Sequence, residues 1–469
     1  MAQQSLIPLQ QAEFDPASYI DPYGRLFQFE GQLYRGIRAA GATFYGELLE
    51  NPLFQGLTRE GKIVGTRRSD SSLEEFELVL EHDTITPRSY CVEWPPEMLQ
   101  AAGTLTLELA EELARQGKTL QDGSPYNVLF RGPRPVFVDV GSICPVEDKF
   151  LWRPYQQFCN LFLFPLYLYE AGLHSIARPF LYDFLRGVPY ELCYRLLPWF
   201  QRWRPQTLAR LSLPLGLDRA IKKLGLEEKL KSSLTRPVGQ EERVRFFSGL
   251  RRDLTSLRLK PARTAWSDYQ EWPSFDQDEQ WTLKQRAIRD VLQRLRPTSV
   301  LDVACNQGWY SNLAARQGAR VIALDQDESC VSQVYRRARQ EGTDILPLRV
   351  DILQPPPAFG WRLKQFSSFF QRVKADMVLA LALIHHLCLA QWQSFERVVE
   401  LFDEFEPGTL VLEFVPAQDD RARPMWESKP EPVDWYHLEG LLEVLGRRYR
   451  ELEVLESFPA GRKLIVATR

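Results

Sequence analysis

Three aspartates, Asp302, Asp325 and Asp351, each follow a short apolar segment in the C-terminal half of the chain. Short apolar runs separated by helical patterns are typical of parallel strands, whose carboxyl ends meet at one edge of a sheet. Carboxylates gathered there favour a cationic ligand, and they accept hydrogen bonds from hydroxyl and amino groups. The spacing therefore predicts a site for a positively charged, hydroxyl-bearing small molecule.

A turn of small residues follows the first aspartate in the stretch VLDVACNQGWYS, residues 300–311. Ala304, Cys305 and Asn306 lead to Gly308, where the missing side chain would let a ligand approach the backbone. Asn306 tolerates the left-handed conformation that a tight turn needs. We expect a helix to begin after Gly308, with free N–H groups that attract a carboxylate or a phosphate.

Two kinds of cofactor compete for this turn. A dinucleotide requires G-x-G-x-x-G, because its pyrophosphate sits against bare backbone, whereas the turn here reads A-x-N-x-G. S-adenosylmethionine has no phosphate and presents an ammonium and a sulfonium, which favour Asp302 nearby. Asp325 would accept the ribose hydroxyls, and Asp351 with Ile352 would contact the adenine. The alternative is that each aspartate only caps the helix that follows it.

The elements that would position these residues alternate regularly from Trp281 onward. Such alternation predicts an α/β fold in which parallel strands are joined by crossover helices, and a final hairpin predicts one antiparallel strand. The expected helices are 283–295, one beginning after Gly308, and 328–340. The expected strands are 299–303, 320–324, 346–350, 376–382, 409–415, 451–458 and 463–469.

The motifs VLDVACNQGWYS, ALDQD, LRVDIL and ADMVLALALIHHL resemble those of class I S-adenosylmethionine-dependent methyltransferases. The resemblance covers about residues 281–469 and implies a Rossmann-like, seven-stranded methyltransferase sheet whose last strand is antiparallel. It departs from the commonest motif at Ala304 and Asn306, where glycine is usual. The cofactor-binding residues that we expect are Asp302, Ala304, Cys305, Asn306, Gly308, Asp325, Gln326, Asp351, Ile352 and Leu381.

Candidate catalytic residues follow the fourth and fifth expected strands. Methyl transfer depends mainly on holding the acceptor in line with the methyl group, so a general base is optional. His385 and His386 would lie at the rim, where a neutral imidazole could take a proton from a hydroxyl. Glu413 is a second rim acid. The alternative is that one histidine bonds the backbone while the other packs, and that Glu413 is a structural acceptor.

The N-terminal part carries a different pattern in LQDGSPYNVLFRGPRPVFVDVG, residues 120–141. The order of Asp122, Asn127 and Asp139 is similar to that of the catalytic and metal-binding residues of protein kinases. However, Leu120 replaces the catalytic-loop histidine, Val140 replaces the phenylalanine after the last aspartate, and no convincing glycine-rich loop or lysine precedes them. We expect a degenerate, inactive kinase-like region, with ATP-dependent phosphotransfer as the alternative.

The whole order of motifs is similar to the nodulation protein NoeA-like family of methyltransferases. We therefore expect an α+β kinase-like region at 1–150, a helical region and linker at 151–270, and the methyltransferase domain at 271–469. The expected activity is methyl transfer from S-adenosylmethionine to an oxygen or nitrogen of a small molecule or glycan. A non-catalytic scaffold that binds the cofactor is the remaining alternative.

Composition excludes several other classes. The net charge of −3 gives no global case for nucleic acid as a partner. The seven cysteines show no C-x-x-C pair or metal spacing, which predicts a reducing, cytoplasmic location and no metal site. The most apolar stretch, from Leu161, is too short to span a membrane. Neither the acceptor nor the oligomeric state can be read from the sequence.

Overall fold

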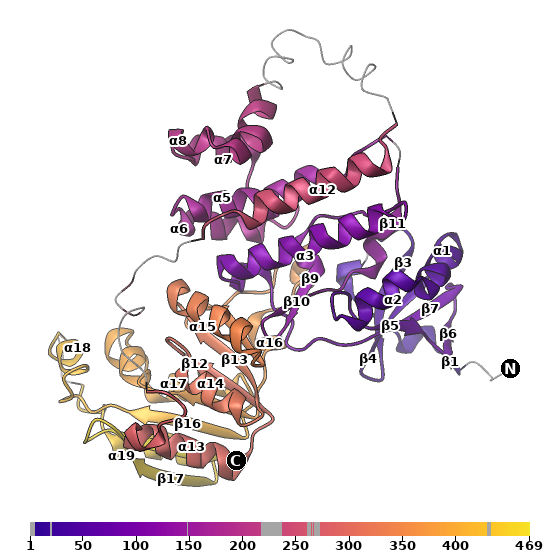
Figure 1. Ribbon diagram of the computed structural model, residues 1–469. Helices are drawn as coiled ribbons and strands as arrows, with labels where there is room; N and C mark the ends of the chain where they lie inside the picture. The colour runs from indigo at the N-terminus through magenta and orange to yellow at the C-terminus, as the bar shows by residue number, and fades with distance from the viewer. Residues whose placement is uncertain are drawn as a thin grey trace.

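The computed structural model describes residues 5–18, 21–147, 149–216, 237–259, 264, 266, 273–428 and 433–469. In Figure 1 the C-terminal sheet lies at the lower left, the N-terminal sheet lies at the right, and long helices run above both. Of the linker that the sequence predicts at 259–281, residues 260–263, 265 and 267–272 lie outside the described residues.

The N-terminal sheet is antiparallel and has five strands in the order β2-β3-β4-β7-β5. Its bounds are β2 (Glu13–Phe14), β3 (Gly24–Phe29), β4 (Gln32–Ile37), β5 (Thr66–Arg68) and β7 (Leu78–His82). Helices α1 (Ala39–Glu50) and α2 (Pro52–Arg59) follow β4, and β1 (Ser5–Ile7) pairs with β6 (Ser71–Leu73). Buried side chains of Phe27, Ile37 and Leu80 form part of the core of this sheet.

Helix α3 (Pro96–Ala114) has a proline at its first position, where the N–H would be unpaired in any case. Two short antiparallel pairs follow it. They are β8 (Lys118–Leu120) with β11 (Ile143–Pro145), and β9 (Val128–Arg131) with β10 (Arg134–Phe137). Asp122, Asn127 and Asp139 of the kinase-like pattern lie in the turns next to these strands.

Short helices fill the middle of the chain. They are α4 (Tyr155–Phe158), α5 (Phe164–Glu170), α6 (His174–Ala177), α7 (Tyr190–Leu196), α8 (Trp199–Arg202), α9 (Pro205–Thr207) and the longer α12 (Gln240–Thr255). Helix α12 lies side by side with α3 (Figure 1). Phe247, Leu250 and Leu254 of α12 are fully buried, so its apolar face is part of the core.

The C-terminal sheet has seven strands in the order β14-β13-β12-β15-β16-β18-β17. All neighbours are parallel except the pairs that β18 makes with β16 and β17. This confirms the expected α/β fold and its antiparallel last strand. The bounds are β12 (Ser299–Val303), β13 (Arg320–Asp325), β14 (Ile345–Arg349), β15 (Met377–Ala380), β16 (Thr409–Phe414), β17 (Glu451–Glu456) and β18 (Lys463–Thr468).

Helices cover this sheet, and capping side chains mark where several of them begin. Thr282 and Gln285 form a reciprocal cap at the start of α13 (Leu283–Leu295), and Asp327 caps α15 (Glu328–Glu341). The others are α14 (Trp309–Arg316), α16 (Phe369–Arg372), α17 (Phe395–Asp403), α18 (Arg423–Glu427) and α19 (Leu438–Gly446). All six residues of β16 are buried, as central parallel strands require.

The N-terminal part packs directly on the C-terminal sheet. Arg372 of α16 forms a buried ion pair with Glu93, and its guanidinium lies 4.2 Å from the ring centroid of Tyr90. His174 and Arg178 of the helical region both contact Glu328 at the start of α15. The two parts therefore share one continuous core.

Candidate active site

The turn between β12 and α14 is held in an unusual backbone conformation. Ala304, Asn306 and Gly308 have φ angles of 59°, 50° and 74°. The Cys305 N–H donates to the Leu324 carbonyl at 2.8 Å, and the Asn306 N–H donates to Asp325 Oδ2 at 2.8 Å. These bonds tie the turn to the end of β13, so the expected cofactor residues of the first two strands lie together.

Gly308 is required by the protein itself. A Cβ at this position would lie 2.7 Å from Val334 Cγ2 of α15, and the positive φ disfavours any other residue. The sequence predicts that Gly308 lets a ligand approach the backbone. The packing of Val334 against the turn is a second reason for a glycine at this position. The helix begins directly after it, as the sequence predicts.

Asp302 and Asp325 form a pair of poorly solvated carboxylates. Asp302 is 2% exposed, and its Oδ2 accepts a hydrogen bond from Ser311 Oγ at 2.5 Å. Burial raises the pKa of Asp302 to about 7, and the nearby charge of Asp325 adds to the shift. Burial also raises the pKa of Asp325 to about 6. A positive ligand between them would relieve both effects, because it favours the ionised form.

These contacts argue against simple helix capping by the first two aspartates. Gly308 is the N-cap of α14, and Asp302 bonds the hydroxyl and the backbone N–H of Ser311 from nine residues earlier in the chain, not from the cap position. Asp327, and not Asp325, caps α15. The Asp325 carboxylate accepts from the backbone N–H groups of Asn306 and Asp327, one at each oxygen, and from that of Gln326, so at least one further acceptor position remains for a hydroxyl donor.

The third strand end is only partly as expected. β14 ends at Arg349, two residues before Asp351, although the Val350 N–H still donates to the Asp325 carbonyl at 2.9 Å. Asp351 Oδ1 accepts from the Leu353 N–H at 3.0 Å, a local turn contact, and the next helical element begins only at Trp361. The neighbouring Ile352 is 8% exposed. It is an apolar residue at the same edge.

The remaining expected cofactor residues lie on either side of this edge. The carbonyl of Gln326 accepts from Arg349 Nε at 3.0 Å, and its side chain is exposed. Leu381 follows β15 and is 8% exposed. Cys305 is buried below the turn. All of them lie at the carboxyl ends of β12, β13, β14 or β15.

The two histidines lie in the segment after β15, with ring centroids 4.2 Å apart. His385 is 2% exposed, and burial lowers its pKa to about 3; the neighbouring His386 lowers it further. Its Nδ1 is buried and has no hydrogen-bond partner among the described residues. Burial also lowers the pKa of His386, which is half-buried. Both imidazoles are therefore neutral near pH 7.

Trp266 links these histidines to the cofactor turn. Its ring centroid lies 5.7 Å from that of His386, in an edge-on arrangement, and its carbonyl accepts from Asn306 Nδ2 at 3.2 Å. His386 is consequently a near neighbour of the turn, whereas His385 lies deeper. Of the two, His386 has the better access to an acceptor.

Glu413 is fully buried in an internal network. Its Oε2 lies 2.6 Å from Lys284 Nζ, and its Oε1 accepts from Ser457 Oγ at 2.6 Å. Both oxygens are thus engaged, and this arrangement favours a structural role over that of a rim acid. Lys284 also lies 5.3 Å from the ring centroid of Tyr310.

Sequence reasoning did not single out Lys284, Ser311 or Trp266. Ser311 stands three residues after Gly308, so one turn of a helix that begins there faces it back toward Asp302; this spacing was available in the sequence. Lys284 reaches Glu413 from 129 residues away. Its positive charge acts on Asp302 and on His385, and no local pattern indicates that.

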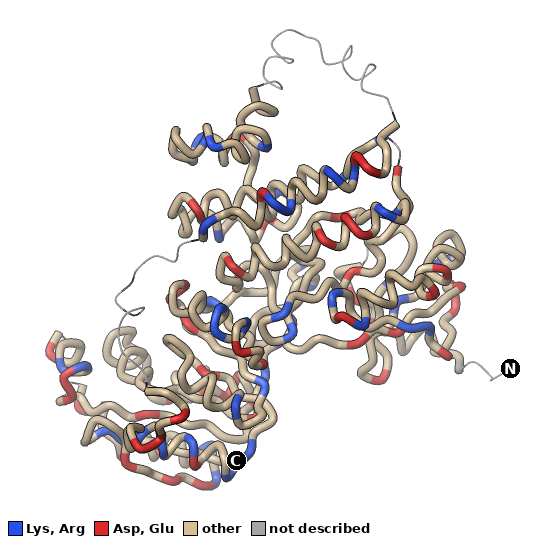
Figure 2. Tube along the Cα trace, in the orientation of Figure 1, with Lys and Arg blue, Asp and Glu red and all other residues tan. Residues whose placement is uncertain are grey.

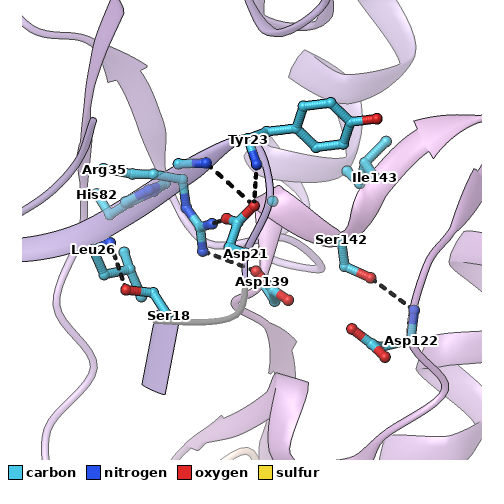
Figure 3. Close-up of polar contacts among 12 residues, drawn as sticks. Ser18, Asp21, Tyr23, Leu26, Arg35, His82, Asp122, Asp139, Ser142 and Ile143 are labelled. Carbon is cyan, nitrogen blue, oxygen red and sulfur yellow. Dashed lines mark hydrogen bonds and ion pairs between the residues drawn. The ribbon is translucent and has the colours of Figure 1, made fainter. Parts of the chain in front are cut away.

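A second polar cluster lies under the N-terminal sheet (Figure 3). Arg35 of β4 is 3% exposed and pairs with Asp21 and with Asp139, the latter at 2.8 Å. A Cβ on Gly141 would lie 2.1 Å from Arg35 Nη1, so the glycine makes room for this guanidinium. Asp122 lies beside Ser142, whose hydroxyl accepts from the Asp122 N–H at 3.1 Å.

This geometry bears on the kinase-like pattern. Burial raises the pKa of Asp122, and the charge of Asp139 adds to the shift, so the two aspartates do converge. Asn127 Nδ2 is buried and has no partner among the described residues. Arg35, however, already forms an ion pair with Asp139, although it shares its charge with Asp21. Within the described ranges no group of three or more His, Cys, Asp or Glu side chains could hold a metal ion.

The segment 355–374, between β14 and β15, largely forms a contact with the N-terminal part. Phe359 and Phe366 stack with centroids 4.6 Å apart and pack against Tyr90 and Tyr126 of the N-terminal part. Its exposed part includes Trp361.

Comparisons with known proteins agree with these features. No protein-family model matches the chain. It is 28% identical over 447 residues to nodulation protein NoeA of Rhizobium meliloti, a match that covers 92% of this chain and 91% of that protein. It is also 28% identical over 145 residues to a protein of Mycolicibacterium smegmatis named a probable S-adenosylmethionine-dependent methyltransferase, covering 31% of this chain and 48% of that protein.

Among solved structures, the bifunctional kinase-methyltransferase WbdD is similar over 42% of each chain, with 14% identity and a TM-score of 0.30. The expected resemblance to NoeA-like proteins and to S-adenosylmethionine-dependent methyltransferases is confirmed by the two sequence matches. They support an enzyme of the methyltransferase type and do not specify an acceptor. No described helix is both long and apolar enough to cross a membrane. The cytoplasmic location stays a prediction.

Proposed function

We propose that this protein transfers a methyl group from S-adenosylmethionine to an oxygen or nitrogen of a small-molecule or glycan acceptor. The observation that carries the proposal is the pair of carboxylates at the ends of β12 and β13. Burial and mutual repulsion raise the pKa of Asp302 to about 7, so an unliganded site favours protonation and a cationic ligand favours ionisation. The name of the Mycolicibacterium relative is consistent with this choice of cofactor.

The residues at hand fit the parts of S-adenosylmethionine. Asp302 would hold the ammonium, Asp325 would accept the ribose hydroxyls, and Asp351 with Ile352 would contact the adenine. The positive φ angles of Ala304 and Asn306 bring the backbone of the turn close to the carboxyl edge of the sheet, where the cofactor would bind. When bound, the cofactor supplies a methyl group on a sulfonium.

The chain itself would supply orientation and a proton acceptor. His386 lies beside Trp266 and is neutral near pH 7, so it can take the proton that an acceptor hydroxyl or amine loses. We assign His385 and Glu413 to supporting positions, because His385 is deeply buried and both oxygens of Glu413 are engaged. Methyl transfer then depends chiefly on alignment.

We further propose the division into an inactive kinase-like region at 1–150, a helical region and linker at 151–270, and the methyltransferase domain at 271–469. The ion pair between Arg35 and Asp139 supports inactivity, because the carboxylate that a kinase uses for metal is already bonded to a guanidinium. The first two parts would support the acceptor side of the site through their packing on α15 and α16.

Calorimetric titration with S-adenosylhomocysteine tests the proposed function. We expect micromolar binding to the wild type, loss of binding in Asp325→Ala, and unchanged binding in Asp376→Ala. Asp376 is a matched control, because it lies at the opposite end of the sheet and accepts from the N–H groups of Thr298 and Ser299. Equal binding in Asp325→Ala and the wild type would refute the assignment.

Magnesium-dependent phosphotransfer by the N-terminal part is the second candidate. The convergence of Asp122 with Asp139 and the unpaired amide of Asn127 favour it, and the Arg35 ion pair opposes it. Titration with ATP and magnesium distinguishes the two. Binding that Asp139→Ala abolishes would establish the second candidate. Cofactor binding without turnover on any acceptor would instead support the scaffold.

A further inference from the structure

Helix α8 exposes a group of aromatic side chains. Trp199 is 74% exposed, Phe200 is 52% exposed, and Trp203, which follows the helix, is 69% exposed. The rings of Trp199 and Phe200 contact each other edge-on, with centroids 6.2 Å apart. Contiguous exposed apolar groups of this kind mark interaction sites in folded proteins. We call Trp199, Phe200 and Trp203 the aromatic patch.

The backbone holds the aromatic patch outward. Gln201, between the aromatics, is 7% exposed and forms the inward side of α8. Arg202 Nε donates to the Leu197 carbonyl at 2.8 Å, and its guanidinium lies 4.6 Å from the ring centroid of Tyr194. Ser212 Oγ donates to the Arg202 carbonyl at 2.9 Å. The helix therefore cannot rotate its aromatic side chains into the core without breaking these contacts.

Positive charge accompanies the aromatic patch. Residues 183–216 contain five arginines against two acids, Asp183 and Glu191. Arg204 and Arg210 pair with acids outside this range, and Arg195 is exposed next to α8. Figure 1 places α7 and α8 at the upper left, apart from both sheets, and Figure 2 shows basic residues on them.

We propose that the aromatic patch binds the interface of an anionic lipid bilayer. Tryptophan has an apolar body and a polar N–H, and it is enriched at the headgroup level of membranes. Arginine next to it gains from the negative surface potential of anionic lipids. Because no described helix can cross a bilayer, the contact is peripheral. The proposal is independent of the methyl-transfer chemistry.

Sedimentation of the full chain with lipid vesicles tests the proposal. The wild type should bind vesicles of phosphatidylglycerol and phosphatidylcholine, and should bind pure phosphatidylcholine more weakly. The triple variant Trp199→Ser, Phe200→Ser, Trp203→Ser should bind more than about tenfold more weakly, because its interfacial side chains are gone. The matched control is Trp361→Ser with Trp392→Ser, two tryptophans that are 57% and 58% exposed elsewhere.

Two readouts guard against misfolding of the triple variant. Arg195→Gln alone should lower the affinity for anionic vesicles about fivefold, and brominated lipids should quench the tryptophan fluorescence of the wild type. Failure of the wild type to bind anionic vesicles, or equal binding by the folded triple variant, would overturn the proposal. A third outcome would also overturn it: the wild type forms a dimer in sedimentation velocity, the triple variant does not, and the wild type does not bind vesicles. In that case a second copy of the chain would cover the aromatic patch.

Discussion

Asp302→Asn should stabilise the protein without ligand while it abolishes cofactor binding. The pKa of Asp302 is raised from its ordinary 3.8 to about 7 in the folded state. As the pH rises from 4 to 7, the unfolded chain gives up this proton while the folded chain keeps it, so folding stability falls over that window. Asparagine keeps the shape and the bond to Ser311 but cannot ionise.

The size of the effect follows from the two pKa values. At about 1.4 kcal/mol for each tenfold change in proton affinity, ionised Asp302 costs the folded state about 4 kcal/mol above pH 7. The group is 2% exposed, so solvent screening removes little of this value. We expect Asp302→Asn to be more stable than the wild type by about 2–4 kcal/mol at pH 8 and by less than about 2 kcal/mol at pH 5.

Urea unfolding at both pH values, followed by tryptophan fluorescence, measures this difference. Asp376→Asn is the matched control at the other end of the same sheet. The hydroxyl of Thr298 and the N–H groups of Thr298 and Ser299 bond the Asp376 carboxylate and lower its pKa. Asparagine there should destabilise the protein at pH 8, which is the opposite sign.

One result would refute the reasoning on Asp302. If Asp302→Asn is less stable than the wild type at pH 8, by as much as at pH 5, the carboxylate is a satisfied structural anion. The cationic ligand would then lose its main support. A stabilised variant that still binds S-adenosylhomocysteine as tightly as the wild type would confirm the raised pKa of Asp302. It would also show that a group other than Asp302 binds the ammonium.

Three further substitutions test the packing around the site, each by urea unfolding. Gly308→Ala should cost about 1–3 kcal/mol, because it combines a positive φ with a contact at 2.7 Å to Val334; a neutral result would mean that the turn relaxes freely. Lys284→Met should cost about 3–5 kcal/mol by leaving buried Glu413 unpaired, and adding Glu413→Gln should restore part of the loss. Arg372→Met should cost a similar amount for the same reason, and no change there would contradict the burial of this pair.

The C-terminal fold follows from the sequence because its signals are local. The expected strand at 299–303 and helix at 283–295 coincide with β12 and α13, whose apolar runs and caps lie within the segments themselves. The strand expected at 376–382 is shorter, since Asp376 turns to the loop before β12 and Ala382 adopts a positive φ. The five-stranded N-terminal sheet was not predicted, because its strands are short and lack a clear alternation.

The polar partners depend on contacts that no sequence window contains. The sequence predicts an edge of carboxylates, and Asp302 and Asp325 do lie together. Arg35 reaches Asp139 across 104 residues, and a search for a kinase-like lysine overlooks it. Arg372 reaches Glu93 across 279 residues. Such pairs become visible only when distant elements are brought together, so the structure adds the Arg35 ion pair to a degeneracy that the sequence already predicts from Leu120 and Val140.

The shared core between the two halves limits how the molecule can be divided. A fragment that begins near residue 271 would leave Glu328 without His174 and Arg178. The same cut would bare the stacked rings of Phe359 and Phe366, which now rest on tyrosines from the other half. We expect such a fragment to self-associate through these exposed rings. A chimera that carries this half of the chain should therefore fold well only if it also carries the segments around Tyr90 and Tyr126.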